Sequence, residues 1–298
     1  MPADQPSTLQ LELLKEAKLA ELLSDPLDLR LEASGVLAKD GIFYVIFDNS
    51  PDIGRIDGGL ARDAAGNRLI RQELGHGAGY EDIAHDWTAE RFYILVEALP
   101  HPGGGFMAKV QEHDERGGYL SDAWLDFPLD RPNKGLEGLA CVQRAGRTHL
   151  LGLCEGNRCR AGAEGRRPGG GRIQVFARGS RRWDHLGTIR LPGSLWFEDY
   201  SSLAVADDRI AVVSQASSAL WVGRFSPSSW ELADQGTTYR FPLDGEGGTV
   251  YCTVEGVSWV AADQVVVVSD KAKAGSQHKR CRAKDQSIHV FALPGAAP

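Results

Sequence analysis

Five positions in the chain carry an oxygen-bearing side chain just before a small or polar residue and an aliphatic one. They are Ser34, Glu81, Glu137, Ser201 and Glu255. If the fold brought these residues together, three carboxylates would repel one another unless a cation neutralised them. Calcium accepts six to eight oxygen ligands in flexible geometry. The pattern therefore predicts one calcium ion held by these five residues. The alternative is that the glutamates only cap the starts of strands.

The elements that must position these residues repeat with them. After each one come a gap and a short apolar segment such as 42–47 or 264–269, followed by a further apolar segment. Such segments, rich in Val, Ile and Tyr, are typical of strands buried on both faces. Five repeats of this length predict an all-β, five-bladed β-propeller of four-stranded antiparallel blades, whose first strands line a central channel. We expect one domain over residues 1–298. Two domains, or six blades with one degenerate, are the alternatives.

The fifth blade lacks a fourth strand, because the chain ends soon after its third strand at 287–293. Residues 9–13 alternate apolar and polar, and we expect them to supply this strand and close the ring without an exposed edge. The composition of 9–23, rich in Leu, Glu, Lys and Ala, is instead typical of a helix.

Loops after the second strands should emerge at the same end of the channel as the five oxygen-bearing residues. Two of these loops are basic in a chain of net charge −7. They suggest a small anionic ligand bound by Arg158, Lys271 and Lys273, with Glu81 and Asp48 as catalytic candidates beside the ion. The alternative is that these are solvated surface loops.

The order Ser, Glu, Glu, Ser, Glu resembles the soluble calcium-activated nucleotidases (apyrases). The matching stretches are 34–36, 80–83, 200–203 and 254–257. This resemblance implies a five-bladed propeller with one calcium ion in its channel. A looser similarity links the Glu-Gly-aliphatic segments at Glu137 and Glu255 to phytase-like and esterase-like propellers, which have six blades. The loops after the second strands lack the acid- and arginine-rich character of the nucleotidases, so the resemblance does not extend to their activity.

Three functions follow from these observations, and the sequence leaves open whether the protein is an enzyme. The first is a calcium-dependent hydrolase of a phosphate ester or anhydride. The second is a non-catalytic propeller that binds a ligand or protein and holds a structural calcium ion. The third is a hydrolase of the lactonase or esterase type.

Charge and composition limit the partners and the location. A net charge of −7 argues against general nucleic-acid binding, and no apolar run is long enough for a membrane span. The first eight residues lack the pattern of a secretory leader, and five cysteines are an odd number, so we expect a reduced, cytoplasmic protein. Three cysteines lie in the two basic loops: Cys154, Cys159 and Cys281. They could form a structural disulfide, include a reactive thiol, or be unrelated to one another. The pair His85 and Asp86 is expected at the surface.

Overall fold

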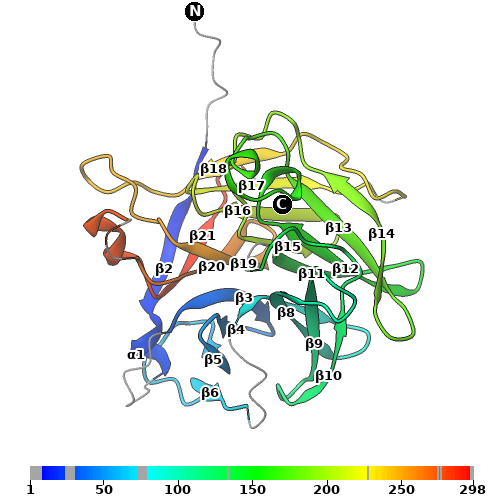
Figure 1. Ribbon diagram of the computed structural model, residues 1–298. Helices are drawn as coiled ribbons and strands as arrows, with labels where there is room; N and C mark the ends of the chain where they lie inside the picture. The colour runs from blue at the N-terminus through cyan, green and yellow to red at the C-terminus, as the bar shows by residue number, and fades with distance from the viewer. Residues whose placement is uncertain are drawn as a thin grey trace, which may run out of the picture.

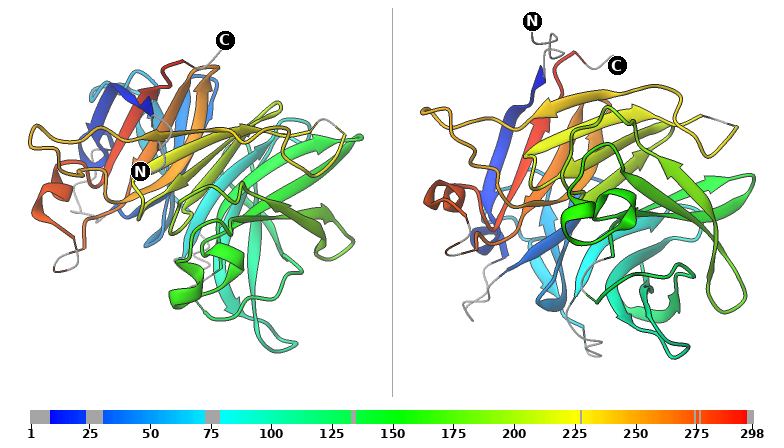
Figure 2. Two further views of the ribbon diagram at one scale, coloured as in Figure 1. Left: turned by 90° about the horizontal axis from the view of Figure 1, so that it is seen from above. Right: turned by 45° about the horizontal axis from the view of Figure 1, so that its top comes forward.

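The computed structural model describes residues 9–23, 31–72, 79–132, 135–226, 228–273, 275 and 277–295. These residues form five antiparallel sheets arranged as blades around a ring (Figure 1). The first strand of every blade contacts the first strands of the two neighbouring blades, so that the five strands surround a central channel. Figure 2 shows the same ring from two further directions. The prediction of an all-β, five-bladed β-propeller is confirmed.

Blades one to four run outward from the channel in sequence order, whereas the outermost strand of blade five comes from the N-terminal part of the chain. Blade one contains β3 (Ala33–Lys39), β4 (Ile42–Phe47), β5 (Ser50–Asp57) and β6 (Arg68–Ile70). Blade two contains β7 (Tyr80–Asp86), β8 (Arg91–Pro100), β9 (Phe106–Asp114) and β10 (Tyr119–Trp124). Blade three contains β11 (Leu136–Arg144), β12 (Arg147–Cys154), β13 (Arg172–Arg178) and β14 (Trp183–Arg190). Blade four contains β15 (Ser202–Ala206), β16 (Arg209–Ser214), β17 (Ala219–Arg224) and β18 (Thr237–Arg240). Blade five contains β19 (Val254–Ala261), β20 (Gln264–Ser269), β21 (Ser287–Ala292) and β2 (Glu12–Lys18).

The N-terminal segment closes the ring, as expected, but with different boundaries. The closing strand β2 pairs antiparallel with β21 from Glu12 to Lys18, rather than over 9–13. The two residues before it, in β1 (Leu9–Gln10), instead extend blade four by pairing in parallel with β18. Of the residues 9–23, whose composition is typical of a helix, only Leu19–Leu23 form one, α1. Its buried leucines pack against blade one. The remaining short helices are η1 (Asn157–Cys159), α2 (Gly162–Gly165) and η2 (Lys279–Ala283).

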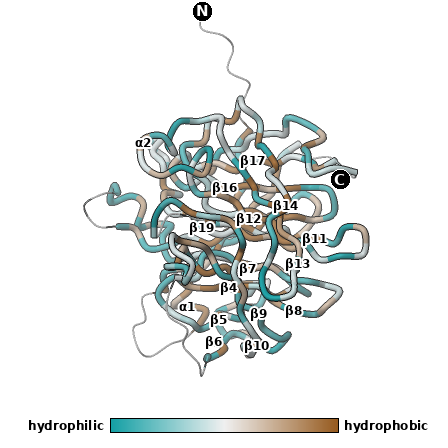
Figure 3. Tube along the Cα trace, turned by 45° about the vertical axis from the view of Figure 1, so that its right-hand side comes forward, coloured by the Kyte–Doolittle hydropathy of each residue, from teal (hydrophilic) through white to brown (hydrophobic). Residues whose placement is uncertain are grey.

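The hydrophobic core is divided among the blade interfaces. Five clusters of buried residues occur, and each lies between two neighbouring blades. The second strand β20 shows why, since Val265 and Val267 face blade four while Val266 and Val268 face blade one. Figure 3 shows hydrophobic strands inside and hydrophilic loops outside. Burial on both faces explains the continuous apolar runs in the sequence.

Candidate functional site

The first strands enter the channel through a β-bulge that sets the direction of one side chain. In blade one, Ala33 pairs with Phe47 and Gly35 with Ile46, which leaves Ser34 as the extra residue. The same irregularity occurs at Glu81, Glu137 and Glu255. In blade four, the amide of Ser201 donates to the carbonyl of Val213, which also pairs with Ser202. A bulge re-aims a side chain out of the regular alternation of a strand. The repeated bulge therefore presents one residue per blade to the same end of the channel.

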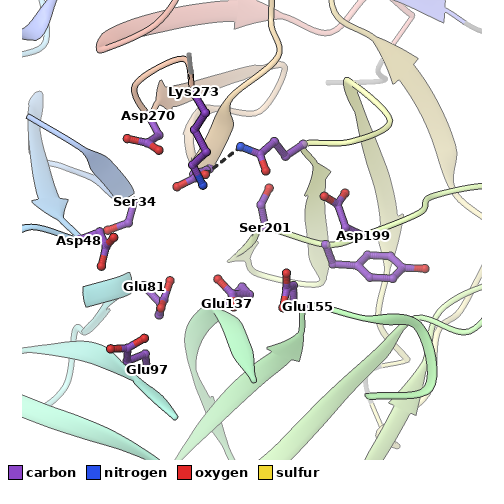
Figure 4. Close-up of a pocket in the computed structure, with 13 residues that line it drawn as sticks. Ser34, Asp48, Glu81, Glu97, Glu137, Glu155, Asp199, Ser201, Asp270 and Lys273 are labelled. Carbon is purple, nitrogen blue, oxygen red and sulfur yellow. Dashed lines mark hydrogen bonds between the residues drawn. The ribbon is translucent and has the colours of Figure 1, made fainter. Parts of the chain in front are cut away.

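All five residues predicted as metal ligands line one pocket of about 270 Å³ (Figure 4). A second tier of lining residues consists of one residue within the second strand β8 and four that directly follow the second strands of the other blades. These are Asp48, Glu97, Glu155, Gln215 and Asp270. The sequence analysis identified only Asp48 from this tier. The others could not be recognised from the sequence, because each is placed by the residue before it, which pairs at or beside the bulge of its own blade, such as Val96 opposite Tyr80.

The pocket is strongly acidic. Eight carboxylates line it, and Lys273 is the one basic side chain among the described lining residues. Burial raises the pKa of Glu81 to about 8, and the charges of Asp48, Glu255 and Glu97 add to the effect. Burial likewise raises the pKa of Asp270 to about 6. The pKa of Glu255 lies well above its usual range, for the same reason and because Asp270 and Glu137 are near. Without a counter-charge, this pocket opposes full ionisation of its own side chains.

Hydrogen bonds inside the pocket satisfy only some of these groups. Gln215 donates to Oε1 of Glu255 at 2.8 Å, and the Ser201 hydroxyl donates to the carbonyl of Val254 at 3.0 Å. The hydroxyl of Ser34 and Oδ1 of Asp270 are buried and have no hydrogen-bond partner among the described residues. Buried polar atoms without a partner are costly and rare in native proteins. Both atoms are oxygens, the ligand type that calcium prefers.

A layer of small and bonded residues fills the channel beneath the pocket. It consists of the residues that follow the five bulged positions: Gly35, Asp82, Gly138, Ser202 and Gly256. The carboxylate Oδ2 of Asp82 accepts from the Leu139 amide and from the Ser202 hydroxyl, both at 2.9 Å. A Cβ on Gly35 would lie 2.9 Å from Cα of Asp82, so only glycine allows this approach. These contacts cross-link three blades and separate the acidic pocket from the opposite end of the channel.

The donor set fits a hard cation, although the side chains do not converge on a single point. Glu and Ser oxygens are the appropriate ligands for calcium, and the partnerless Ser34 hydroxyl is one of them. Within the described ranges, no three His, Cys, Asp or Glu side chains are grouped closely enough to hold a metal ion as they stand. Figure 4 shows the carboxylates spread around the wall with open space between them. Binding an ion would require glutamate side chains to turn inward.

The predicted anion-binding residues are only partly brought to the site. Lys273 lines the acidic pocket, whereas Arg158 and Lys271 do not line it. The Arg158 guanidinium instead contacts the carbonyl of Arg167 at 3.3 Å. A second pocket of about 520 Å³ adjoins the acidic one and shares Glu155, Asp199 and Gln215 with it. Its lining includes three arginines that the sequence analysis did not single out: Arg131, Arg160 and Arg166.

Two disulfide bonds lie in the loops that frame the acidic pocket. Cys154 bonds Cys159 beside Glu155, and Cys252 bonds Cys281 in the loop that follows Asp270. Only Cys141 is a free thiol. The premise of an unpaired, reduced set of cysteines is therefore wrong, and the cytoplasmic location inferred from it stays a prediction. Disulfides persist mainly in oxidising compartments.

The expected surface position of His85 and Asp86 is also wrong. Both side chains are buried, at the far end of the channel from the acidic pocket. Among the described residues, no helix is long and apolar enough to cross a membrane.

Comparisons with known proteins identify the fold and not the family. No family model and no curated protein sequence matches the chain. Among solved structures, it is similar to a glutaminyl cyclase from Myxococcus xanthus, with 12% identity and a TM-score of 0.56 over 97% of this chain and 99% of that one. It is also similar to a GH43_1 enzyme from Xanthomonas citri, with 13% identity and a TM-score of 0.53 over 95% and 90% of the two chains. A third similar structure is the calcium-binding protein regucalcin from Agrobacterium tumefaciens strain C58, with 9% identity and a TM-score of 0.50 over 97% and 96%. None of these three is a calcium-activated nucleotidase. Identities this low establish the propeller fold alone.

Proposed function

We propose that the protein binds one calcium ion at the acidic end of its channel, through Glu81, Glu137 and Glu255 with the hydroxyls of Ser34 and Ser201. The observation that carries this proposal is the concentration of eight carboxylates around a pocket of about 270 Å³ that contains a single lysine. Burial, and after it the repulsion between neighbouring carboxylates, raises the pKa of Glu81 and Glu255, and a divalent cation would offset both by stabilising the ionised forms. It would also give the buried hydroxyl of Ser34 a partner.

Calcium binding is tested by titrating chelator-treated protein in a calorimeter and by thermal denaturation with calcium, magnesium, zinc or EDTA. At a calcium concentration one hundred times Kd, we expect about 2.7 kcal/mol of added stability. Glu137→Gln should remove most of this gain, whereas Glu12→Gln, on an exposed residue of β2, should preserve it. Absence of binding heat, together with melting curves that calcium leaves unchanged, would show that the carboxylates have a structural role.

A calcium-dependent hydrolase of a phosphate ester or anhydride is the activity that these surroundings favour. The supporting observation is the arginine-lined pocket that shares Glu155, Asp199 and Gln215 with the acidic pocket. Arginine binds phosphate and carboxylate groups through its planar fork of donors. One anionic group of a substrate would lie there or beside Lys273, and another would reach the ion site. When bound, the ion would supply polarisation of the phosphoryl group and charge neutralisation.

The roles proposed for the chain's own residues follow from their environments. Asp48 and Glu81 are the candidates to take a proton from the attacking water, since burial raises the pKa of both carboxyl groups. Lys273, Arg131 and Arg166 are the candidates to bind the anion. Neither Arg131 nor Arg166 has an ion-pair partner within the part of the chain that the structure describes.

The activity is tested on ATP, ADP, GDP, UDP, phytate and simple lactones, each with calcium and with EDTA. We expect calcium-dependent turnover that Glu81→Gln abolishes, and a raised KM in Lys273→Ala. Calcium binding without turnover on any of these substrates would favour the non-catalytic propeller. Turnover of lactones alone would favour the esterase type.

A further inference from the structure

A second cavity opens at the opposite end of the channel. It encloses about 440 Å³ and is built from the ends of all five first strands and the turns that follow them. The aromatic and apolar part of its lining consists of Trp87, Trp259, His85, Cys141, Val142 and Val205. Volumes of this size, with mixed apolar and polar walls, are typical of small-molecule sites. The Asp82 layer separates this cavity from the acidic pocket.

Two tryptophans dominate the wall of this cavity. Trp87 is 60% exposed, which is unusual for the largest apolar side chain. Its indole packs against the His85 ring with centroids 4.6 Å apart, and the Lys39 ammonium lies 5.4 Å from its ring centroid. On blade five, the ring of Trp259 lies 4.5 Å from the guanidinium of Arg209, which does not line this cavity. Both indoles are therefore held in place while remaining accessible from the cavity.

Asp86 and Lys39, near this cavity, have polar partners, whereas Asp207, the second carboxylate of its lining, is exposed to water. The Asp86 carboxylate accepts four hydrogen bonds, from the amides of Thr88 and Ala89 and from the side chains of Gln143 and Thr148. Lys39 pairs with Asp40 and Glu115. A charged ligand would find little to neutralise here, so an uncharged ligand fits this cavity better.

One buried atom in the cavity wall, a nitrogen of His85, has no hydrogen-bond partner among the described residues. Nε2 of His85 contacts Oε1 of Glu115 at 3.1 Å, whereas Nδ1 is buried and has no partner among the described residues. When Nε2 donates to the Glu115 carboxylate, Nδ1 is an acceptor. His85 itself is only 4% exposed. Because this nitrogen is buried, an N–H or O–H donor on a bound molecule would reach it only if the imidazole ring turned toward the cavity.

We propose that this cavity binds a small, uncharged aromatic molecule that carries a hydrogen-bond donor. The two tryptophans would stack on the ring, and Nδ1 of His85 would accept from the donor after the imidazole ring had turned toward the cavity. This inference does not depend on the calcium proposal, because it uses none of the residues of the acidic pocket.

Indole is a suitable probe, since it is planar, neutral and has one N–H donor. Its binding is measured by calorimetry on the full chain and compared with that of 1-methylindole, which lacks the donor, and of methyl β-glucopyranoside, which lacks the aromatic ring. We expect indole to bind about fivefold more tightly than 1-methylindole, as a single neutral hydrogen bond allows. The glucoside should not bind measurably.

Variants locate the binding. Trp87→Ala should weaken indole binding about tenfold, and its exposed position makes the substitution compatible with folding. Ala206→Trp, in the cavity wall, should block binding by filling the space. Glu81→Gln and EDTA should leave it unchanged, because they affect only the acidic pocket.

Three results would overturn the proposal. One is the absence of binding heat for indole up to its solubility limit. The second is indole affinity that Trp87→Ala and Ala206→Trp leave unchanged while Glu81→Gln alters it. The third is binding of the glucoside in preference to indole.

Discussion

Replacing Glu81 by glutamine should have opposite effects in metal-free and calcium-loaded protein. The pKa of Glu81 is raised from 4.5 to about 8 by burial and by neighbouring carboxylates. The folded state therefore binds this proton more tightly than the unfolded state does. The resulting stability is full below pH 4.5 and is lost as the pH rises from 4.5 towards 8. Glutamine is neutral throughout and avoids this loss.

The size of the effect follows from the pKa difference. The ionised form of Glu81 should cost the metal-free protein about 3 kcal/mol at pH 7 and about 4 kcal/mol at pH 8, relative to pH 4. In EDTA, Glu81→Gln should match the parent protein at pH 5 within about 1 kcal/mol and exceed its free energy of unfolding by these amounts at pH 7 and 8. In calcium, the parent protein should gain stability and the variant should gain much less.

The assay is urea denaturation at pH 5, 6, 7 and 8, each with EDTA and with calcium, for the parent, Glu81→Gln and the exposed control Glu12→Gln. The control should follow the parent under every condition. If Glu81→Gln in EDTA is less stable than the parent at pH 8, or if the two differ equally at every pH, the carboxylate is not under the electrostatic strain described here.

Three further predictions concern the fold. Deleting residues 1–18 removes β1 and β2 and exposes β21, so the truncated chain should aggregate or lose its cooperative melting transition; melting like that of the full chain would show that ring closure is dispensable. Asp82→Asn places an NH2 group against the amide of either Leu139 or Ile83, both of which donate to the carboxylate, and should lower the free energy of unfolding by about 2 kcal/mol in denaturant titration; an unchanged midpoint would contradict its bridging role. Replacing Cys252 and Cys281 by serine should lower the free energy of unfolding by about 3.5 kcal/mol, and replacing Cys154 and Cys159 should lower it by about 2 kcal/mol. The first bond closes a 29-residue separation and the second closes one of only five residues. Equal losses of stability would show that loop length does not set the effect.

The sequence predicted the ring and its five inward-facing residues because both follow from a repeat. Ser34, Glu81, Glu137, Ser201 and Glu255 precede similar apolar runs, and a propeller converts equal positions in a repeat into equal positions around an axis. Their role as metal ligands stays a prediction.

What the sequence did not predict depends on local backbone detail. The bulges that aim these residues have no residue signature, so Glu97, Glu155 and Asp270 could not be recognised as a second tier. Arg158 and Lys271 belong to loops that do follow second strands, but each loop has its own path, and only Lys273 reaches the acidic pocket. The boundary between β2 and α1 within a uniformly Leu-, Glu- and Lys-rich segment is set by pairing with β21.

The pairing of β2 with β21 has a consequence for how the chain folds. Pairing Lys18 with Ser287 joins residues 269 positions apart (287 − 18), and closing such a loop in a disordered chain costs about 3 kcal/mol more than closing a ten-residue loop. Blades one to four consist of hairpins between adjacent strands and can form without that cost. Strand β2 is thus synthesised before the strands of blades one to four but pairs after them. Until residues 287–292 emerge from the ribosome and pair with β2, the interface between blades five and one, which includes Val266 and Val268 of β20, stays incomplete. The interval before ring closure is when this chain is most exposed to aggregation, and when a chaperone that shields strand edges would help most.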